Sequence, residues 1–260
     1  MNIVVLVKQV PDTYSERKLS DADSTLDRDS ADAVLDEINE KAVEQALQIK
    51  EAGEGEVTVV CVGPDRATDA IRKALSMGAD KAVHVCDDAL HGSDVLATAK
   101  VIAAAIGKGD APDLVLAGNE ATDGGGGAIP AILSELLGLP QLTHAREVSI
   151  EGQTVKATRE TDEGLTYLEA NLPAIVSVAE KINEPRYPSF KGIMAAKKKP
   201  VETLTVADLG VDAGEVGLGN AWSTVTEAAP KPPRAAGQKA EDEGDGGTKI
   251  AEYLVAQKLI

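Results

Sequence analysis

The residues best suited to chemistry form a glycine-rich run at 118–127, between a predicted strand at 114–117 and a predicted helix that ends at Gly138. Backbone N–H groups at the start of such a helix can bind a phosphate, and glycines let the phosphate approach closely. No Gly-Lys-Ser/Thr follows, which argues against an NTP-hydrolysing P-loop. Four consecutive glycines are also typical of a flexible strand-to-helix turn, so the run by itself leaves both interpretations open.

Other chemistries lack a supporting pattern. The first predicted strand, 2–7, ends in Lys-Gln-Val-Pro-Asp without the glycines of a Rossmann dinucleotide site, which argues against a nicotinamide dehydrogenase. The three histidines, His84, His91 and His144, are dispersed and favour neither hydrolysis nor metal binding. Cys61 and Cys86 lie in apolar, strand-like runs and are expected to be buried and reduced.

A second candidate site is the segment 182–200, which combines prolines, a rare aromatic and a basic cluster. Pro185 and Pro188 favour a stiff, exposed loop and disfavour a regular helix across the segment. Phe190 is the single phenylalanine of the chain, and a triple lysine follows at 197–199 in a protein of net charge −17. These features fit a docking surface, and they fit a solvated surface connector equally well.

The elements that must position these residues alternate between apolar runs and amphipathic stretches. Strands are expected at 2–7, 57–62, 82–86 and 114–117, and helices at 39–50, from 63–64 to 77–78, at 95–106 and from 124–127 to 138. This order predicts an α/β fold with a mostly parallel sheet and helices on both faces. Alternating stretches at 147–150, 154–159 and 165–170 predict antiparallel strands with tight turns, and 172–178 is expected to return to the main sheet.

The C-terminal part has a different composition. Residues 230–247 are rich in proline, glycine and acidic residues, which predicts a flexible tether. Residues 249–260 then form a short amphipathic helix suited to a partner surface or to the body of the protein. We therefore expect a C-terminal arm that is distinct from the α/β body of the protein.

The charge excludes one class of partner. With 43 acidic against 26 basic residues, the chain is expected to be repelled by nucleic acid. The acidity is spread along the chain, which favours a cytoplasm at high salt over an ordinary acidic protein. No run is long enough to insert into a bilayer and no signal peptide precedes the first strand, so a cytoplasmic location is expected.

Four motifs resemble those of electron-transfer flavoprotein β subunits. They are the opening Val-Leu-Val-Lys-Gln-Val-Pro-Asp-Thr at 5–13, Arg-Glu-Thr-Asp-Glu-Gly at 159–164, Leu-Pro-Ala-Ile-Val-Ser-Val at 172–178, and the segment from Asn183 through Gly-Ile-Met to the lysines. The similarity runs from Met1 to about Leu209. It implies a nucleotide-binding-like domain at 1–209, which contains the recognition loop 182–200, and a C-terminal arm at 210–260.

The resemblance implies a Rossmann-like, adenine-nucleotide-binding fold and a set of nucleotide-contacting positions. The implied positions are Leu6, Asp36, Glu37, Ile38, Asn39, Val62, Gly118, Asn119, Glu120, Asp123, Gly124, Gly125, Gly126, Gly127, Ala128 and Ile129. The nucleotide would be AMP, or a second FAD in electron-bifurcating members. Gly125, Gly126, Ala128 and Pro130 stand where the family has Asp, Thr, Gln and Gly, which leaves only backbone donors for a phosphate. Asp36 also departs from the family pattern, and an ordinary helix N-cap is the alternative for it.

The resemblance also implies the function. The chain would be a non-enzymatic β subunit that passes electrons from flavin dehydrogenases to a membrane quinone oxidoreductase, through an FAD held mainly by the α subunit. Too few aromatic residues are present to enclose a flavin in this chain alone, and Tyr14 is the candidate for the isoalloxazine ring. Phe190 would anchor partner recognition, surrounded by Arg186, Lys197, Lys198 and Lys199. The alternatives are an electron-bifurcating subunit with a second FAD and a free-standing nucleotide-binding regulatory protein.

Overall fold

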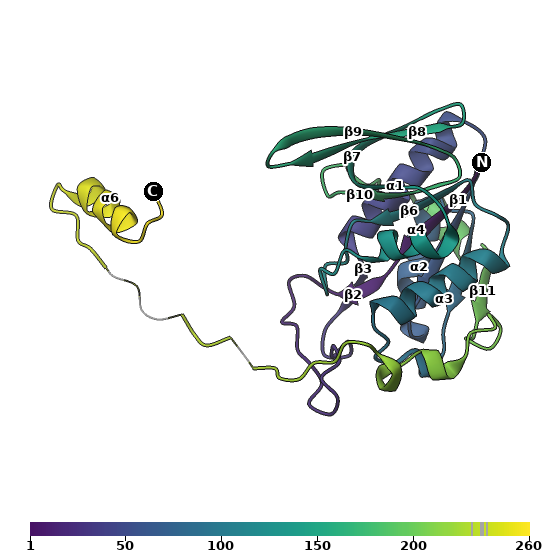
Figure 1. Ribbon diagram of the computed structural model, residues 1–260, viewed down its shortest axis with the longest axis horizontal. Helices are drawn as coiled ribbons and strands as arrows, with labels where there is room; N and C mark the ends of the chain where they lie inside the picture. Colours follow the sequence, from purple (N-terminus) through teal and green to yellow (C-terminus); the bar gives the residue numbers. More distant parts are fainter. Residues whose placement is uncertain (230, 235–236, 238) are drawn as a thin grey trace. The chain divides into compact units, whose positions relative to one another are not determined.

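The computed structural model describes all of the chain except residues 230, 235, 236 and 238, and it divides into two compact units. Unit one is Met1–Thr226 and unit two is Glu227–Ile260. Unit one is built on a nine-stranded sheet in the order β11-β5-β4-β1-β6-β10-β7-β8-β9 (Figure 1). Its strands are β1 (Asn2–Val7), β4 (Glu56–Val62), β5 (Lys81–Val85), β6 (Leu114–Gly118), β7 (Gln141–Glu151), β8 (Thr154–Thr161), β9 (Gly164–Asn171), β10 (Ala174–Val178) and β11 (Val201–Leu204).

The sheet confirms the predicted α/β class. Neighbouring strands from β11 to β7 are parallel, whereas β7, β8 and β9 form the predicted antiparallel extension. A separate antiparallel pair consists of β2 (Gln9–Pro11) and β3 (Ala33–Leu35). The chain builds from β1 towards β4 and β5 and then crosses to β6 on the other side of β1, so the direction of winding reverses between β1 and β6. Ligands of open α/β sheets bind at the carboxyl ends of strands at such a reversal.

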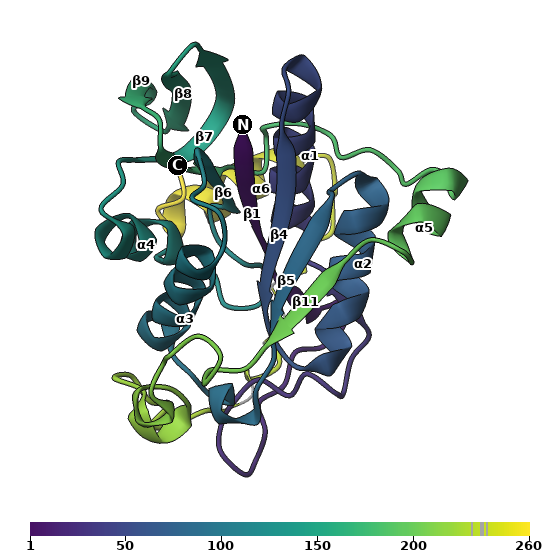
Figure 2. The same ribbon diagram turned by 90° about the vertical axis from the view of Figure 1, so that its right-hand side faces the viewer.

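Helices cover both faces of the sheet (Figure 2). α1 (Glu37–Ala52) and α2 (Thr68–Met77) pack on one face, and α3 (Val95–Lys108) and α4 (Ile129–Leu137) on the other. Because both faces are covered, the central strands are almost continuously apolar, as β6 is along its whole length. The short 3-10 helices η1 (Asp65–Ala67), η2 (Asp88–Leu90), η3 (Ala213–Glu215) and η4 (Leu218–Asn220) complete the unit.

The core is built from Val, Leu, Ile and Ala, and all six aromatic side chains lie at the surface. Their exposed fractions run from 47% to 97%, for Tyr14, Tyr167, Tyr187, Phe190, Trp222 and Tyr253. Aromatic residues supply much of the energy of protein–protein contacts. The aromatic side chains therefore contribute little to the core, which depends on aliphatic packing.

The structure corrects two expectations. The segment 182–200 is not a loop throughout, because α5 (Phe190–Ala196) begins directly after the second proline. The prolines restrict only residues up to 188, and the Ser189 hydroxyl then caps the helix by accepting from the Gly192 N–H at 3.0 Å. Cys61 is buried as expected, but Cys86 lies just beyond β5 and is only partly buried. Burial raises the pKa of Cys61 to about 12.

The described residues of unit two form the helix α6 (Gly246–Ala256), where a short amphipathic helix was predicted. Ile250, Val255 and Leu259 are all more than half exposed. Of the helices in the described residues, none is both long and apolar enough to cross a membrane.

Candidate functional site

The nucleotide-contacting positions implied by the sequence gather at the carboxyl edge of the sheet. Leu6 lies near the end of β1, Val62 ends β4, and Gly118 ends β6. The first turn of α1 and the loop 119–128 adjoin these strand ends. The site therefore occupies the reversal between β1 and β6, where the winding rule places a ligand.

Asp36 joins the first turn of α1 to the glycine-rich loop. One carboxylate oxygen accepts from the N–H groups of Ile38 and Asn39 at 3.0 and 3.1 Å, which makes Asp36 the N-cap of α1. The other oxygen accepts from the N–H and the hydroxyl of Thr122 at 2.7 and 2.8 Å. The side chain is fully buried. Asp36 therefore holds the first turn of α1 and the glycine-rich loop together, in agreement with the interpretation of this residue as a helix N-cap.

Gly118 is required by close packing rather than by backbone conformation. A Cβ atom at this position would lie 2.7 Å from the Asn39 side-chain nitrogen and 3.0 Å from a methyl group of Ile38. Both distances are shorter than van der Waals contact. The absence of a side chain thus lets the end of β6 rest directly against α1.

Asp123 is the centre of an ion-pair cluster that sequence reasoning did not find. Its carboxylate lies 2.7 Å from the Lys8 ammonium and 3.2 Å from the Arg28 guanidinium, and its side chain is only 2% exposed. Burial opposes ionisation, but the two cations outweigh it and hold the pKa of Asp123 below its usual value. Lys8 directly follows an apolar strand, and this position is the sequence feature that could have indicated a cation beside Asp123. Arg28 lies 95 residues from Asp123 in the sequence, and no local pattern indicates that it reaches this carboxylate.

The same cluster attaches the acidic segment 12–32 to the site. Arg66 donates to the Asp29 carboxylate and to the Arg28 carbonyl, and it exchanges hydrogen bonds with Gln9 at the start of β2. Tyr14, on this segment, is 97% exposed and available to another molecule.

The glycine-rich loop leaves backbone donors unused. The N–H groups of Gly124 and Gly125 both bond to the Ala121 carbonyl, and Gly125 and Gly127 have positive φ. In the described residues, the N–H groups of Gly126, Gly127 and Ala128 have no acceptor, and no side chain caps α4. Such a row of N–H groups before a helix is suited to a phosphate.

Asn119 adds a second sign of a ligand. Its side-chain oxygen is buried and, among the described residues, has no hydrogen-bond partner. Unpaired buried acceptors are rare in proteins, and a ligand hydroxyl or amino group would satisfy this one. Backbone N–H groups that could bind a phosphate, together with the unpaired Asn119 oxygen that could accept from a ligand, fit a nucleotide. Glu37 and Glu120 carry negative charge, and Lys8 and Arg28 are already paired with Asp123, so a phosphate here would depend on the backbone N–H groups.

The segment 182–200 is the second candidate site, and its Phe190 side chain is 81% exposed. Arg186 is held within the chain: its guanidinium pairs with Glu44 at 2.7 Å and with Glu51 at 2.5 Å, both on α1. Burial raises the pKa of Glu44, but Arg186 outweighs this effect and lowers it overall. Arg186 thus fixes the segment to α1.

Lys199 is partly buried and makes hydrogen bonds within the chain, whereas Lys197 and Lys198 are exposed. The Lys199 ammonium donates to the carbonyls of Leu75 and Ala79 at the end of α2, at 2.9 and 2.5 Å. Burial lowers its pKa. Phe190 is therefore held between two attachments, one on α1 and one on α2.

These features describe an α/β protein with a candidate ligand site at a sheet edge and an exposed aromatic side chain on a separate segment. A family model described as "Electron transfer flavoprotein domain" matches residues 23–209. Proteins named electron transfer flavoprotein subunit beta are similar over their whole length. The one from Mycobacterium tuberculosis is 66% identical over 264 residues, covering 100% of this chain and 99% of that protein, and the one from Mycobacterium leprae is 64% identical with the same coverage. The one from Syntrophomonas wolfei is 41% identical, covering 98% of this chain and 96% of its own.

The chain belongs to the electron transfer flavoprotein β subunit family. It is an electron-transfer protein rather than a classical enzyme.

Proposed function

We propose that this chain is the β subunit of a cytoplasmic, heterodimeric electron transfer flavoprotein. It takes electrons from flavin dehydrogenases, such as acyl-CoA dehydrogenases, and passes them to a membrane quinone oxidoreductase. The observation that carries the proposal is Phe190, an 81% exposed aromatic side chain held by attachments to α1 and α2. An aromatic side chain that is already fixed loses little entropy on docking.

The flavin belongs mainly to the α subunit in this proposal. With all six aromatic side chains at the surface, this chain offers no apolar enclosure for an isoalloxazine ring. Tyr14 and the segment 12–32 would cover one side of the FAD from the β subunit. When bound, FAD supplies the redox chemistry. The residues of this chain orient it, exclude water and present the docking surface.

The glycine-rich loop would hold a second nucleotide, AMP or FAD. The free N–H groups of Gly126, Gly127 and Ala128 support a phosphate there, and the Asn119 oxygen supports a donor on the ligand. No atom lies within 4 Å of a Cβ built at Gly124 or Gly126, so the loop is open. The second candidate function is the electron-bifurcating form, in which this loop would hold a second FAD.

One experiment tests these proposals together. The chain is co-expressed with an α subunit, the complex is purified, and all bound nucleotides are extracted and counted. One FAD and one AMP per heterodimer would support the simple carrier, and two FAD would support the bifurcating form. A β chain that purifies folded, monomeric and without any α subunit would contradict the heterodimer.

A further inference from the structure

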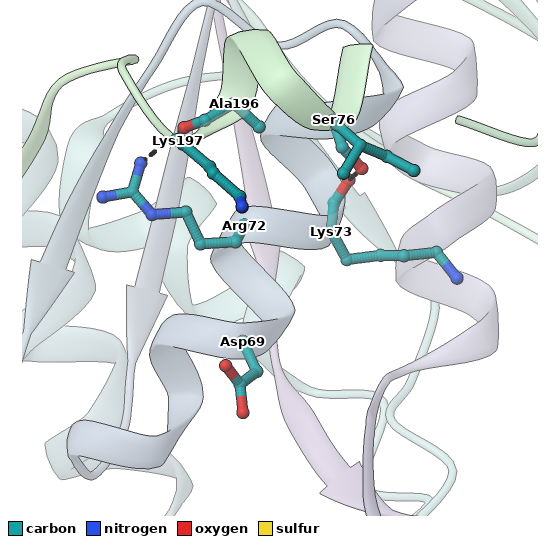
Figure 3. Close-up of a pocket in the computed structure, with 7 residues that line it drawn as sticks. Asp69, Arg72, Lys73, Ser76, Ala196 and Lys197 are labelled. Atoms are coloured by element: carbon teal, nitrogen blue, oxygen red, sulfur yellow. Dashed lines mark hydrogen bonds between the residues drawn. The ribbon is translucent and has the colours of Figure 1, made fainter. Parts of the chain in front are cut away.

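An open pocket of about 440 Å³ lies between α2 and α5, on the element that begins with Phe190 (Figure 3). Its lining includes Asp69, Arg72, Lys73, Ser76, Ile193 and Lys197. The nucleotide site and the proposed flavin contact do not use these residues.

The pocket is preformed because α5 sits directly on α2. A Cβ atom at Gly192 would lie 2.5 Å from the Ser76 carbonyl oxygen, so only glycine allows this approach. The Arg72 guanidinium donates to the carbonyls of Ala196 and Lys199 at 2.7 and 3.0 Å, and the first of these bonds is drawn in Figure 3. The walls therefore need no rearrangement to receive a ligand.

The rim carries uncompensated positive charge. In the described part of the chain, no carboxylate lies within 4.0 Å of the Arg72 guanidinium or the Lys197 ammonium, whereas Lys73 pairs with Glu40 at 3.0 Å. In Figure 3 Lys197 descends from α5 towards Arg72, and Lys73 projects to the other side of α2. Asp69 is the single acidic residue of the lining. Such a positive patch is exceptional in a chain of net charge −17.

We propose that this pocket binds a carboxylate-bearing side chain of the flavin dehydrogenase while Phe190 docks beside it. The inference rests on the proposed function. Ile193 provides an apolar wall for the aliphatic part of the incoming side chain, and Arg72 and Lys197 meet its carboxylate. Because the chain is acidic overall, complementary positive charge at this point would orient the encounter with the dehydrogenase. The contact is reciprocal: each protein inserts one side chain into the other.

The test uses the FAD-loaded heterodimer and an acyl-CoA dehydrogenase, with flavin reduction followed by absorbance. Lys197→Glu is compared with Lys100→Glu, which makes the same charge change on α3, on the opposite face of the sheet. We expect Lys197→Glu to lower kcat/KM about tenfold at low salt, through KM, and much less at high salt. Lys100→Glu should leave it within twofold of the parent. Equal effects of the two variants would overturn the pocket assignment.

A second pair of variants separates this inference from the proposed function. Ile193→Trp fills the pocket without changing charge and should raise KM, while the FAD spectrum stays unchanged. Phe190→Ala tests docking itself. If Phe190→Ala raises KM but neither Ile193→Trp nor Lys197→Glu does, the pocket assignment alone is overturned. If Phe190→Ala has no effect on KM, the docking function fails and the pocket assignment with it.

Discussion

Phe190 is the single residue with the largest expected consequence for electron transfer. Small, transient interfaces depend on one or two apolar anchors, and this side chain is 81% exposed on a fixed element. Phe190→Ala should therefore weaken binding of the dehydrogenase by about 2 kcal/mol, or about thirty-fold. The measurement is steady-state reduction at sub-saturating flavoprotein. Leu136→Ala, an exposed apolar truncation on α4, is the matched control. Equal rates for parent and Phe190→Ala would show that segment 182–200 is a surface connector and not a docking surface.

Asp123 should make stability sensitive to acid. Its pKa in the folded protein lies below the ordinary 3.8, so its ion pairs contribute fully above that value and are lost as the pH falls through the folded pKa. Removing a buried partner leaves Lys8 and Arg28 uncompensated, and Asp123→Asn should cost about 1 to 3 kcal/mol at pH 7.

Thermal unfolding of parent and Asp123→Asn between pH 7 and 3 tests this assignment. The difference in Tm should be largest near neutral pH and shrink below pH 4, as the Asp123 carboxylate takes up a proton first in the unfolded chain and, at lower pH, in the folded protein. A difference independent of pH would show that packing, rather than charge, sets the effect.

Among the elements, α5 shows where sequence patterns stop being informative. The strands of the parallel sheet and the helices around it were predictable because apolar runs and 3.6-residue periods record burial directly. The short helix α5 was not predictable, since its support comes from distant groups, namely the carbonyls of α2 that bind Lys199 and the glutamates of α1 that bind Arg186. The ion pair between Arg28 and Asp123 was hidden for the same reason. No local pattern encodes contacts 95 residues apart.

The attachment of α5 to α2 can be tested at Lys199. Lys199→Met keeps the aliphatic chain but removes both hydrogen bonds to the end of α2. Leaving those carbonyls unpaired should cost about 1 to 3 kcal/mol locally and loosen the helix that carries Phe190. Hydrogen–deuterium exchange of residues 190–196 should be faster than in the parent. Lys198→Met, an exposed neighbour, is the control, and equal exchange in both variants would contradict the attachment.

At the scale of the whole molecule, the C-terminal unit cannot bury its apolar residues by itself, and we expect the α subunit to cover them. An 11-residue helix is marginal in water by itself, and Ile250, Val255 and Leu259 are exposed on or just after α6. Deletion of residues 249–260 should therefore weaken association with the α subunit. Titration of the truncated and full-length chains with the α subunit measures the effect, and unchanged affinity would make the unit a mere appendage.

The net charge of −17 should also make the fold dependent on salt. Self-repulsion of an acidic surface destabilises the compact state, and added ions screen it over distances that shrink from about 30 Å at 0.01 M to 3 Å at 1 M. The Asp123 carboxylate is buried and therefore less affected by added ions, so unpaired surface carboxylates dominate the response. We expect stability to rise by about 1 to 2 kcal/mol between low salt and 1 M KCl, with a Tm increase of about 2 to 8 °C. Equal increases in KCl and NaCl would identify screening as the cause. A Tm that falls or stays constant would show that the carboxylates are already compensated within the fold, and the adaptation to high salt inferred from composition would then be wrong.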